Sequence, residues 1–553
     1  MRIKNGKRNI LIFAVIFTAL ISLSFLINQE SRDFRLGKNL DIFFSLIREL
    51  NTFYVDEIDP DKIIRTGIES ILRSLDPYTT FYSESEIEDF NFMTTGKYGG
   101  IGCLIRKNGD YAVITEVYKG FPADIAGIKI GDFILKIEGQ SLKNVAVDKV
   151  SEKLKGEPES TVAVTIGRNG KEIEYKLKRQ KISLPPVPYY GMITPETGYI
   201  RFTNFTQNCY EDVKKALTEL KNHNPEGIIL DLRSNPGGIM NEAVDIVNLF
   251  VGQGTEVVST RGRIKQFNAT YTTRNQAVDE NIPLVILINR MSASASEIVA
   301  GSIQDLDRGV IIGQRSFGKG LVQITRPLSY NTQLKVTTAK YYIPSGRCIQ
   351  AIDFAHRNED GSVAYIPDSL IKTFKTRNGR PVKDGGGITP DIEVQTDTLS
   401  LIATELYTRN FIFDYATKYY WSHPEIKEIG QVSLSDRDFE DFISFLNEKG
   451  FNYKTLTERS FSEMIENARK EKLYEANREL FSSLQKVISH DLKRDLMNFK
   501  AEILEILADE IIRRYFYEEG AIEWSAKNDE QVKKAIEILN DTQLYKSILR
   551  GKK

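Results

Sequence analysis

The stretch Leu284-Val-Ile-Leu-Ile-Asn-Arg-Met-Ser-Ala-Ser-Ala-Ser-Glu-Ile-Val-Ala-Gly301 joins an apolar run to a turn of small hydroxyl residues and a helix-forming segment. An uninterrupted run of branched aliphatic residues is typical of a strand buried on both faces of a parallel sheet. The sequence therefore predicts a strand over 283–289, followed at once by a helix over 294–305.

The same alternation extends to both sides of this stretch. Upstream, an apolar run over 227–232 predicts a buried strand, and a helical pattern follows it near 241–250. Strands that alternate with helices are the mark of a layered α/β arrangement. We expect that arrangement from about residue 190 to 395, after a stiff linker formed by Pro185, Pro186 and Pro188.

Length and composition predict a globular chain of several domains. Its 553 residues correspond to about three to five domains. Lys and Arg total 74 and Asp and Glu 75, so the net charge is −1 and a nucleic-acid partner is not expected. The cysteines and histidines are scattered, which predicts neither a disulfide framework nor a metal site, and no cofactor is expected. They are Cys103, Cys209, Cys348, His223, His356, His423 and His490.

The serines after the strand at 283–289 have two interpretations. Ser294 is a helix N-cap candidate, because Glu297 three residues later completes a capping-box pattern. Alternatively, Ser294 is a nucleophile whose oxyanion is held by backbone N–H groups at the positive end of the helix. The second interpretation requires a general base.

A lysine in a glycine-rich loop is the candidate base. Lys319 lies in Gly313-Gln-Arg-Ser-Phe-Gly-Lys-Gly320, and it can act only if its pKa falls through desolvation or a nearby positive charge. The loop also fits the phosphate-binding pattern G-x-x-x-x-G-K. However, Gly320 replaces the required Ser or Thr, and a strand pattern follows instead of a helix, so phosphate binding is not expected.

Between about 95 and 181 the chain predicts a small β-rich module. Its stretch from Pro122 to Gly139 resembles the middle of a PDZ domain. Upstream, the sequence pattern is typical of a carboxylate-binding loop, whose backbone N–H groups capture a peptide C-terminus. The residues of this loop are Gly99, Gly100, Ile101 and Gly102. Ordinary turn chemistry is the alternative for these glycines. A helix over 147–154 is expected to close the groove.

These motifs together resemble the C-terminal processing peptidases, or tail-specific proteases. The resemblance rests on the PDZ-like module, on Asp231-Leu-Arg-Ser-Asn-Pro-Gly-Gly238, on the serine run and on Gly318-Lys-Gly-Leu-Val-Gln323, and it covers about 35–395. Further similar segments are Leu75-Asp-Pro-Tyr-Thr-Thr-Phe81, Tyr341-Tyr-Ile-Pro-Ser-Gly346 and Gly386-Gly-Ile-Thr-Pro-Asp391. The resemblance implies a multidomain α/β fold with a crotonase-like serine peptidase core.

The resemblance also implies roles for individual residues. It makes Ser294 the nucleophile, Lys319 the base and Gln323 the residue that orients the lysine. The oxyanion donors would be the backbone N–H groups of Ala295 and Gly237, with Gly238 as an alternative. Asp305, sometimes counted with the catalytic set of this family, is expected to be structural. The resemblance makes the PDZ loop over 99–102 the site that binds the substrate's C-terminal tail.

The implied activity is that of a serine endopeptidase, a hydrolase that reads exposed protein C-termini through its PDZ domain. Its substrates would be unfolded proteins or proteins with accessible tails, and an activating adaptor is a further partner that the resemblance allows. A second function class is a catalytically idle PDZ scaffold that binds exported protein tails. The serine, lysine and glutamine are all present at family spacing, which favours the enzyme. A serine-lysine amidase on another fold leaves the PDZ-like module unexplained.

The N-terminal sequence predicts a segment that directs the chain to a membrane. Arg2, Lys4, Lys7 and Arg8 precede an uncharged apolar run over 10–27, and such a run spans roughly 27 Å as a helix. Positive charge on the leading side directs the rest of the chain out of the cytoplasm, to the periplasmic side of an inner membrane. No small-residue cleavage site is obvious, so an uncleaved anchor is favoured over a signal peptide, and a buried core helix is a third interpretation.

Beyond about residue 396 the sequence is helical and charged. One long amphipathic stretch is expected from Ser460 to Glu518, where no glycine occurs. A packed helical subdomain and a homodimer seam both fit this pattern. The sequence therefore predicts a signal peptide or anchor over 1–30, a helical region over 31–94, the PDZ-like module over 95–181, the peptidase core over 182–395 and a helical region over 396–553.

Overall fold

The computed structural model describes residues 32–358, 362–395 and 398–551. These residues form two compact units, divided after Phe81. The first contains helices α2 (Arg32–Phe53) and α3 (Pro60–Arg73), within the helical region that the sequence predicts over 31–94. Helix α3 begins where it does because the Asp59 carboxylate accepts hydrogen bonds from the first backbone N–H groups and Pro60 follows it. The short strand β1 (Thr80–Tyr82) lies at the division.

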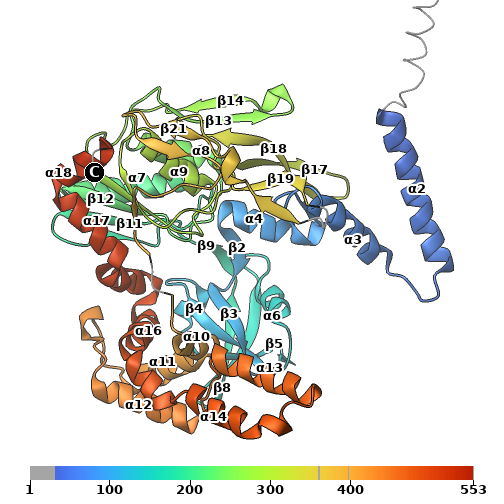
Figure 1. Ribbon diagram of the computed structural model, residues 1–553, viewed down its shortest axis with the longest axis vertical. Helices are drawn as coiled ribbons and strands as arrows, with labels where there is room; N and C mark the ends of the chain where they lie inside the picture. The colour runs from blue at the N-terminus through green and yellow to red at the C-terminus, as the bar shows by residue number, and fades with distance from the viewer. Residues whose placement is uncertain (1–31, 359–361, 396–397, 552–553) are drawn as a thin grey trace, which may run out of the picture. The chain divides into compact units, whose positions relative to one another are not determined.

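The PDZ module is a twisted antiparallel sheet closed by a helix (Figure 1). Its strands follow the order β3-β4-β5-β7-β8, and β6 pairs with β5. The helix at Val147–Leu154, α6, has the bounds that the sequence predicts. The bounds are β3 (Cys103–Asn108), β4 (Tyr111–Val117), α5 (Pro122–Ile125), β5 (Phe133–Ile137), β6 (Gln140–Ser141), β7 (Thr161–Arg168) and β8 (Lys171–Lys178).

A two-stranded ribbon connects the PDZ module to the peptidase core. It consists of β2 (Lys97–Gly100) and β9 (Gln180–Ser183), which pair antiparallel on either side of the module in sequence. Helix α4 (Ile87–Thr95) precedes β2 and ends at Gly96, whose positive φ of 67° caps the helix. The preceding 3₁₀ turn covers Glu84–Glu86. Both crossings between module and core therefore lie side by side.

The peptidase core is a three-layer α/β arrangement, as the sequence predicts. Its sheet has the order β10-β11-β12-β15-β16-β23, parallel except for the β10–β11 pair. Alternate residues of β12 face opposite layers: Ile228 and Leu230 pack with α7, α8 and α9, and Ile229 packs with α17 and α18. The bounds are β10 (Tyr189–Met192), β11 (Thr197–Arg201), α7 (Cys209–Lys221), β12 (Gly227–Asp231), α8 (Met240–Asn248), β15 (Leu284–Ile288), α9 (Ala295–Asp305), β16 (Val310–Gly313) and β23 (Ile392–Glu393).

A second, antiparallel sheet lies beside this sandwich and carries the glycine-rich loop into the site. In it β17 (Leu321–Pro327) pairs with β18 (Gln333–Tyr342), which also pairs with β13 (Glu256–Gly262). The loop that contains Lys319 runs from the end of β16 to the start of β17. The remaining short elements are β14 (Ala269–Thr272), β19 (Ile352–Arg357), β20 (Val363–Tyr365), β21 (Thr373–Lys375) and β22 (Pro381–Lys383), with 3₁₀ turns at Lys265–Phe267 and Asp368–Leu370.

The C-terminal region is helical, as the sequence predicts, and the amphipathic stretch from Ser460 to Glu518 is divided among several helices. It is divided because the chain turns at Lys472, which has φ of 62°, and restarts at Asp491, whose carboxylate caps the next helix. The helices are α10 (Leu401–Thr408), α11 (Phe411–Ser422), α12 (Asp436–Glu448), α13 (Leu456–Lys470), α14 (Arg478–Ile488), α15 (Leu492–Asn498), α16 (Lys500–Asn528), α17 (Glu530–Asn540) and α18 (Thr542–Leu549), with 3₁₀ turns at Ile429–Gln431 and Glu475–Asn477.

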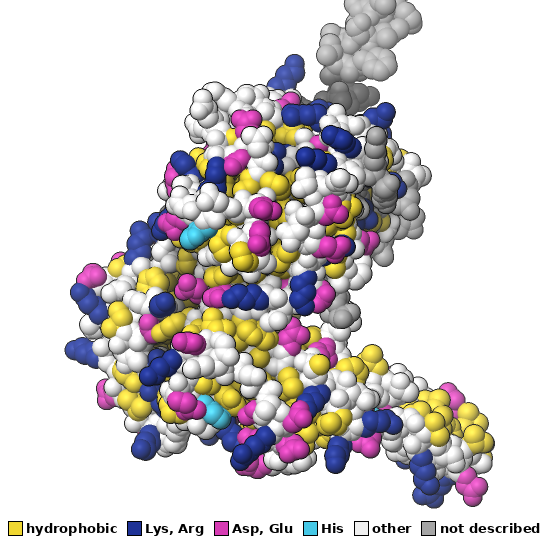
Figure 2. Space-filling view, turned by 90° about the vertical axis from the view of Figure 1, so that its left-hand side faces the viewer, with side chains coloured by type: hydrophobic (Ala, Val, Ile, Leu, Met, Phe, Trp, Pro, Cys, Tyr) yellow, Lys and Arg dark blue, Asp and Glu magenta, His cyan; other side chains and the backbone are white. Residues whose placement is uncertain are grey.

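The predicted membrane segment over 10–27 lies outside the described residues and stays a prediction. Within the ranges that the structure does describe, no helix is both long and apolar enough to cross a bilayer. Side chains of both charges are interspersed over the face drawn in Figure 2, in keeping with the net charge of −1.

Candidate active site

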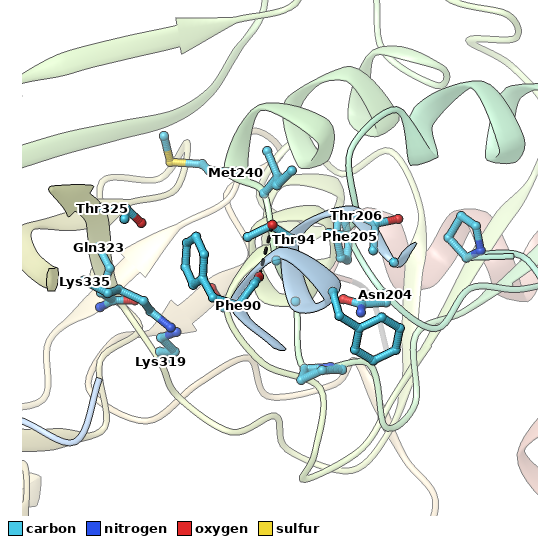
Figure 3. A pocket seen from close by; sticks show the side chains of 18 of the residues that line it. Phe90, Thr94, Asn204, Phe205, Thr206, Met240, Lys319, Gln323, Thr325 and Lys335 are labelled. Carbon is cyan, nitrogen blue, oxygen red and sulfur yellow. Dashed lines mark hydrogen bonds between the residues drawn. The ribbon is translucent and has the colours of Figure 1, made fainter. Parts of the chain in front are cut away.

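A cavity of about 770 Å³ lies where the α/β core, the second sheet and helix α4 meet. Ser294, Lys319 and Gln323, which the sequence singles out, all line it. Figure 3 shows Lys319, Gln323 and Lys335 together on one side of this cavity. The cavity therefore brings together residues from a helix start, a glycine-rich loop and a strand. Its size is in the usual range for a ligand-binding pocket.

Only one of the three serines in the 292–296 run lines the cavity. Ser292 is fully buried, and its hydroxyl donates to the Leu232 carbonyl at 2.8 Å. Ser296 is also fully buried, and its hydroxyl donates to the Asn235 carbonyl at 2.9 Å. These two hydroxyls donate to the backbone of the 231–238 loop, so Ser294 is the one serine of this run that lines the cavity.

Ser294 has an unusual backbone conformation. Its φ of 57° and ψ of −115° lie outside the regions that residues with a side chain normally occupy. Ser294 precedes the first residue of α9, so the sharp turn presents its side chain at the helix N-terminus. Such a conformation costs on the order of 1–3 kcal/mol and persists only where surrounding contacts enforce it.

One buried carboxylate makes several of those contacts. Glu297 is fully buried, and its Oε2 accepts the backbone N–H of Ser294 at 2.8 Å and that of Lys319 at 2.9 Å. Its Oε1 accepts the Ser316 hydroxyl at 2.6 Å and the Gly318 N–H at 2.7 Å. Burial raises the pKa of Glu297 to about 7, although these four hydrogen bonds favour the ionised form.

The predicted base, Lys319, and its predicted partner, Gln323, lie on consecutive elements. Lys319 is half-buried at the end of the loop, and Gln323 is in β17. The Gln323 side-chain amide donates to the Thr337 hydroxyl of the adjacent strand β18 at 3.1 Å. The catalytic roles of Ser294, Lys319 and Gln323 stay predictions, because geometry alone does not test them.

The predicted oxyanion donors lie close to one another. A methyl group added at Gly237 would stand 2.8 Å from the Ala295 backbone nitrogen and 2.8 Å from Ser294 Cβ. The Gly237 N–H, however, donates to the Asn235 side chain at 2.9 Å. An oxyanion role for Gly237 therefore requires that bond to change, whereas the alternative donor, Gly238, also lines the cavity. Both assignments stay predictions.

The PDZ loop residues are divided between two environments. Gly100, Ile101 and Gly102 line a groove of about 190 Å³ together with Ser151 and Leu154 of α6. Gly99 instead faces the loop after α6, where an added methyl group would stand 2.1 Å from the Gly156 carbonyl oxygen. The groove has the strand, loop and helix walls that β-augmentation of a peptide requires.

Sequence reasoning missed two side chains at the site. Phe90 of α4 lines the cavity (Figure 3). The Tyr341 hydroxyl contacts the carbonyls of both Ser294, at 3.1 Å, and Lys319. Tyr341 lies in a segment that the sequence comparison singles out, whereas nothing in the sequence near Phe90 indicates a position at the cavity.

Three family models match the chain. Peptidase family S41 matches residues 196–356, the PDZ domain matches residues 91–167, and the C-terminal helical domain of a probable PDZ-protease matches residues 402–539. The first match contains both the serine run and the glycine-rich loop. The three together follow the order of the PDZ module, the α/β core and the helical region.

The chain is also similar to individual proteases of known name. A carboxy-terminal-processing protease of Bartonella bacilliformis is 35% identical over 57% of this chain and 73% of its own length. A probable CtpA-like serine protease of Staphylococcus aureus is 33% identical over 62% of this chain and 69% of its own length. Among solved structures, a photosystem II D1 C-terminal processing protease is 27% identical over 65% of this chain and 93% of its own, with a TM-score of 0.36. The chain thus belongs to the carboxy-terminal-processing proteases of peptidase family S41, serine proteases with a PDZ domain.

Proposed function

We propose that this serine protease works through a Ser294/Lys319 dyad on substrates whose C-terminal tails bind the PDZ groove, in an extracytoplasmic compartment. One observation carries the catalytic part: Ser294 and Lys319, from separate segments of the chain, line one cavity and share a backbone hydrogen-bond acceptor in Glu297. The tail-binding groove supports the second part.

The chemistry follows from these positions. Lys319 in its neutral form takes the proton from the Ser294 hydroxyl as the Ser294 oxygen attacks a peptide carbonyl. Backbone N–H groups of Ala295 and the Gly237–Gly238 turn stabilise the oxyanion. Protonated Lys319 then donates its proton to the leaving amine, and water hydrolyses the acyl-enzyme.

The location is proposed from the N-terminus. The basic residues before the apolar run at 10–27 support an anchor that leaves the protease on the extracytoplasmic side. The partners we propose are unfolded or tail-exposed proteins in that compartment. Neither an activating adaptor nor a homodimer is needed for this mechanism.

Cleavage of a model substrate tests the proposal. The full chain in mild detergent is incubated with an unfolded protein that carries, or lacks, an apolar C-terminal tail. We expect turnover that the tail increases and that Ser294→Ala abolishes. Tail binding without turnover by the wild-type chain would instead support the idle scaffold.

The oxyanion turn gives a second prediction. Gly237→Ala keeps its backbone N–H but displaces it, and is expected to lower kcat on the order of 10²- to 10³-fold, the usual effect when an oxyanion donor no longer reaches the oxyanion. Its φ of 91° disfavours a side chain, and the added methyl group would stand 2.5 Å from the Ala293 carbonyl oxygen. Steady-state kinetics check this expectation. A matched control is Gly254→Ala, at φ of 80° with open space around it; if the two variants behave alike, the oxyanion assignment is wrong.

The PDZ groove gives a third prediction. Gly102→Ala places a methyl group 2.4 Å from Phe121 Cβ at a φ of 80°, so the loop must shift. We expect tail affinity, measured by fluorescence anisotropy with a labelled tail peptide, to fall at least about tenfold, as a loss of roughly 1.4 kcal/mol would produce. Labelling of Ser294 by a serine-directed phosphonate should be unchanged. Unchanged tail affinity would place the tail-binding site elsewhere.

A further inference from the structure

Glu297 accepts hydrogen bonds from the backbone N–H groups of both the proposed nucleophile, Ser294, and the proposed base, Lys319. The side chain extends from the first turn of α9 and is fully enclosed by the turn before that helix and by the glycine-rich loop. It accepts four hydrogen bonds from four different residues. A carboxylate with full acceptor occupancy is the arrangement in which a buried charge is tolerated.

The division of these bonds between the two oxygens is informative. Oε2 alone accepts both the Ser294 N–H and the Lys319 N–H, at 2.8 and 2.9 Å. The nucleophile and the base, 25 positions apart in sequence (319 − 294 = 25), are therefore connected through a single atom. Oε1 fixes the preceding part of the loop through Ser316 and Gly318.

The loop has a second point of attachment that orients the Ser316 hydroxyl. Ser316 Oγ accepts the backbone N–H of Ile388 at 2.6 Å while it donates to Glu297. Because its acceptor side is occupied in this way, the hydroxyl proton is directed toward the carboxylate. The Glu297 carboxylate thus faces donors only.

We infer that Glu297 is a positioning residue of the peptidase, which in its ionised form sets the separation and orientation of Ser294 and Lys319. The inference rests on the proposed dyad and deepens it. A protonated or amide side chain presents a donor to these N–H groups, so it must break at least one of the contacts that hold the two backbones together. A displacement of about 1 Å between reacting groups is enough to cost on the order of 10²-fold in rate.

Glu297→Gln is the direct test, made in the full chain with a peptide substrate. We expect kcat to fall on the order of 10²-fold or more, with KM within about threefold, because the amide disturbs the dyad and not the PDZ groove. Glu502→Gln is the matched control, since Glu502 also accepts a backbone N–H and a serine hydroxyl, both from Ser400 of the helical region. Equal kcat values for Glu297→Gln and the wild type would overturn the inference.

The pH profile separates positioning from a merely structural role. Of the titratable residues nearby, Lys319 contacts Glu297 through its backbone N–H, and the Tyr341 hydroxyl donates to the carbonyl of Ser294, whose N–H Glu297 accepts. Ionised Glu297 and neutral Lys319 both require proton loss, so log kcat/KM should rise with pH with a limiting slope of about two, and of about one in Glu297→Gln. A slope that the substitution leaves unchanged contradicts the inference.

Ser316→Ala keeps the test decisive if Glu297→Gln does not fold. The Ser316 hydroxyl lowers the pKa of Glu297, which burial raises to about 7, so its removal favours the protonated form. We expect the acid limb that belongs to Glu297 to move to higher pH. An unmoved limb excludes Glu297 as the titrating group. If the wild-type chain itself shows no turnover, the proposed dyad fails instead, and the two failures are distinguishable.

Discussion

Ser294→Ala and Lys319→Ala are each expected to lower kcat by at least about 10⁴-fold and to leave tail binding unchanged. In the proposed mechanism, Ser294→Ala removes the atom that would form the acyl-enzyme, and Lys319→Ala removes the group that would take its proton. Because members of one catalytic unit act together, the double variant should be no slower than either single variant within about tenfold. Single-turnover cleavage and phosphonate labelling measure both effects.

Lys335→Ala is the matched control for the base. Two lysines line the cavity, and Lys335, on β18, lies on the same side as Lys319 (Figure 3). Lys335 is not tied to the nucleophile through Glu297, so its loss should cost at most about tenfold. If Lys335→Ala abolishes turnover and Lys319→Ala does not, the base has been assigned to the wrong lysine.

The sequence predicts the local parts of the fold well, because each depends on neighbouring residues. The strand and helix around 284–305 appear as β15 and α9, within a residue of the expected bounds. The helix over 147–154 is also correct. Apolar runs and caps are short-range signals, and no other part of the chain is needed to interpret them.

Contacts between distant segments could not be predicted in this way. Helices α17 and α18 cover the second face of the core sheet, where the Tyr545 hydroxyl accepts the Leu284 N–H at 3.0 Å. Phe413 of α11 packs into the PDZ core, beneath the guanidinium group of Arg106 at 4.4 Å. The amphipathic pattern of the helical region indicates a buried face but not the surface that covers it.

In the candidate site, too, local features could be predicted from the sequence and contacts between distant segments could not. From the local sequence alone, Ser294 could be either a helix N-cap or a nucleophile. The structure shows that the two interpretations are compatible, because Ser294 precedes α9 and also lines the cavity. Glu297 fits the capping-box pattern through its bond to the Ser294 N–H. Its bonds to Gly318 and Lys319 involve backbone N–H groups, which any residue except proline supplies, so no sequence signal announces them.

Arg347→Met is expected to destabilise the core by about 3–5 kcal/mol, the usual cost of breaking a buried ion pair. Arg347 and Asp305 are both almost fully buried and lie 2.8 Å apart, and burial raises the pKa of Asp305 and lowers that of Arg347 despite their attraction. The loss of Arg347 leaves a charge that only protonation can neutralise. The loss in free energy of unfolding should therefore shrink as pH falls. The raised pKa of Asp305 gives stability at low pH, and this stability is lost as pH rises.

The double variant Arg347→Met/Asp305→Leu decides what Asp305 does. Removing both charges should recover part of the lost free energy of unfolding, measured by chemical denaturation, because no unpaired charge remains, although the Ser345 N–H and Gln304 Oε1 lose their partners. Asp305 ends α9, at the opposite end of that helix from Ser294, and its Oδ2 accepts the Ser345 N–H at 3.0 Å. If Asp305 is structural, the stable double variant cleaves substrate at nearly the wild-type rate. A stable but inactive double variant would instead make Asp305 a member of the catalytic set, acting through α9 on the nucleophile.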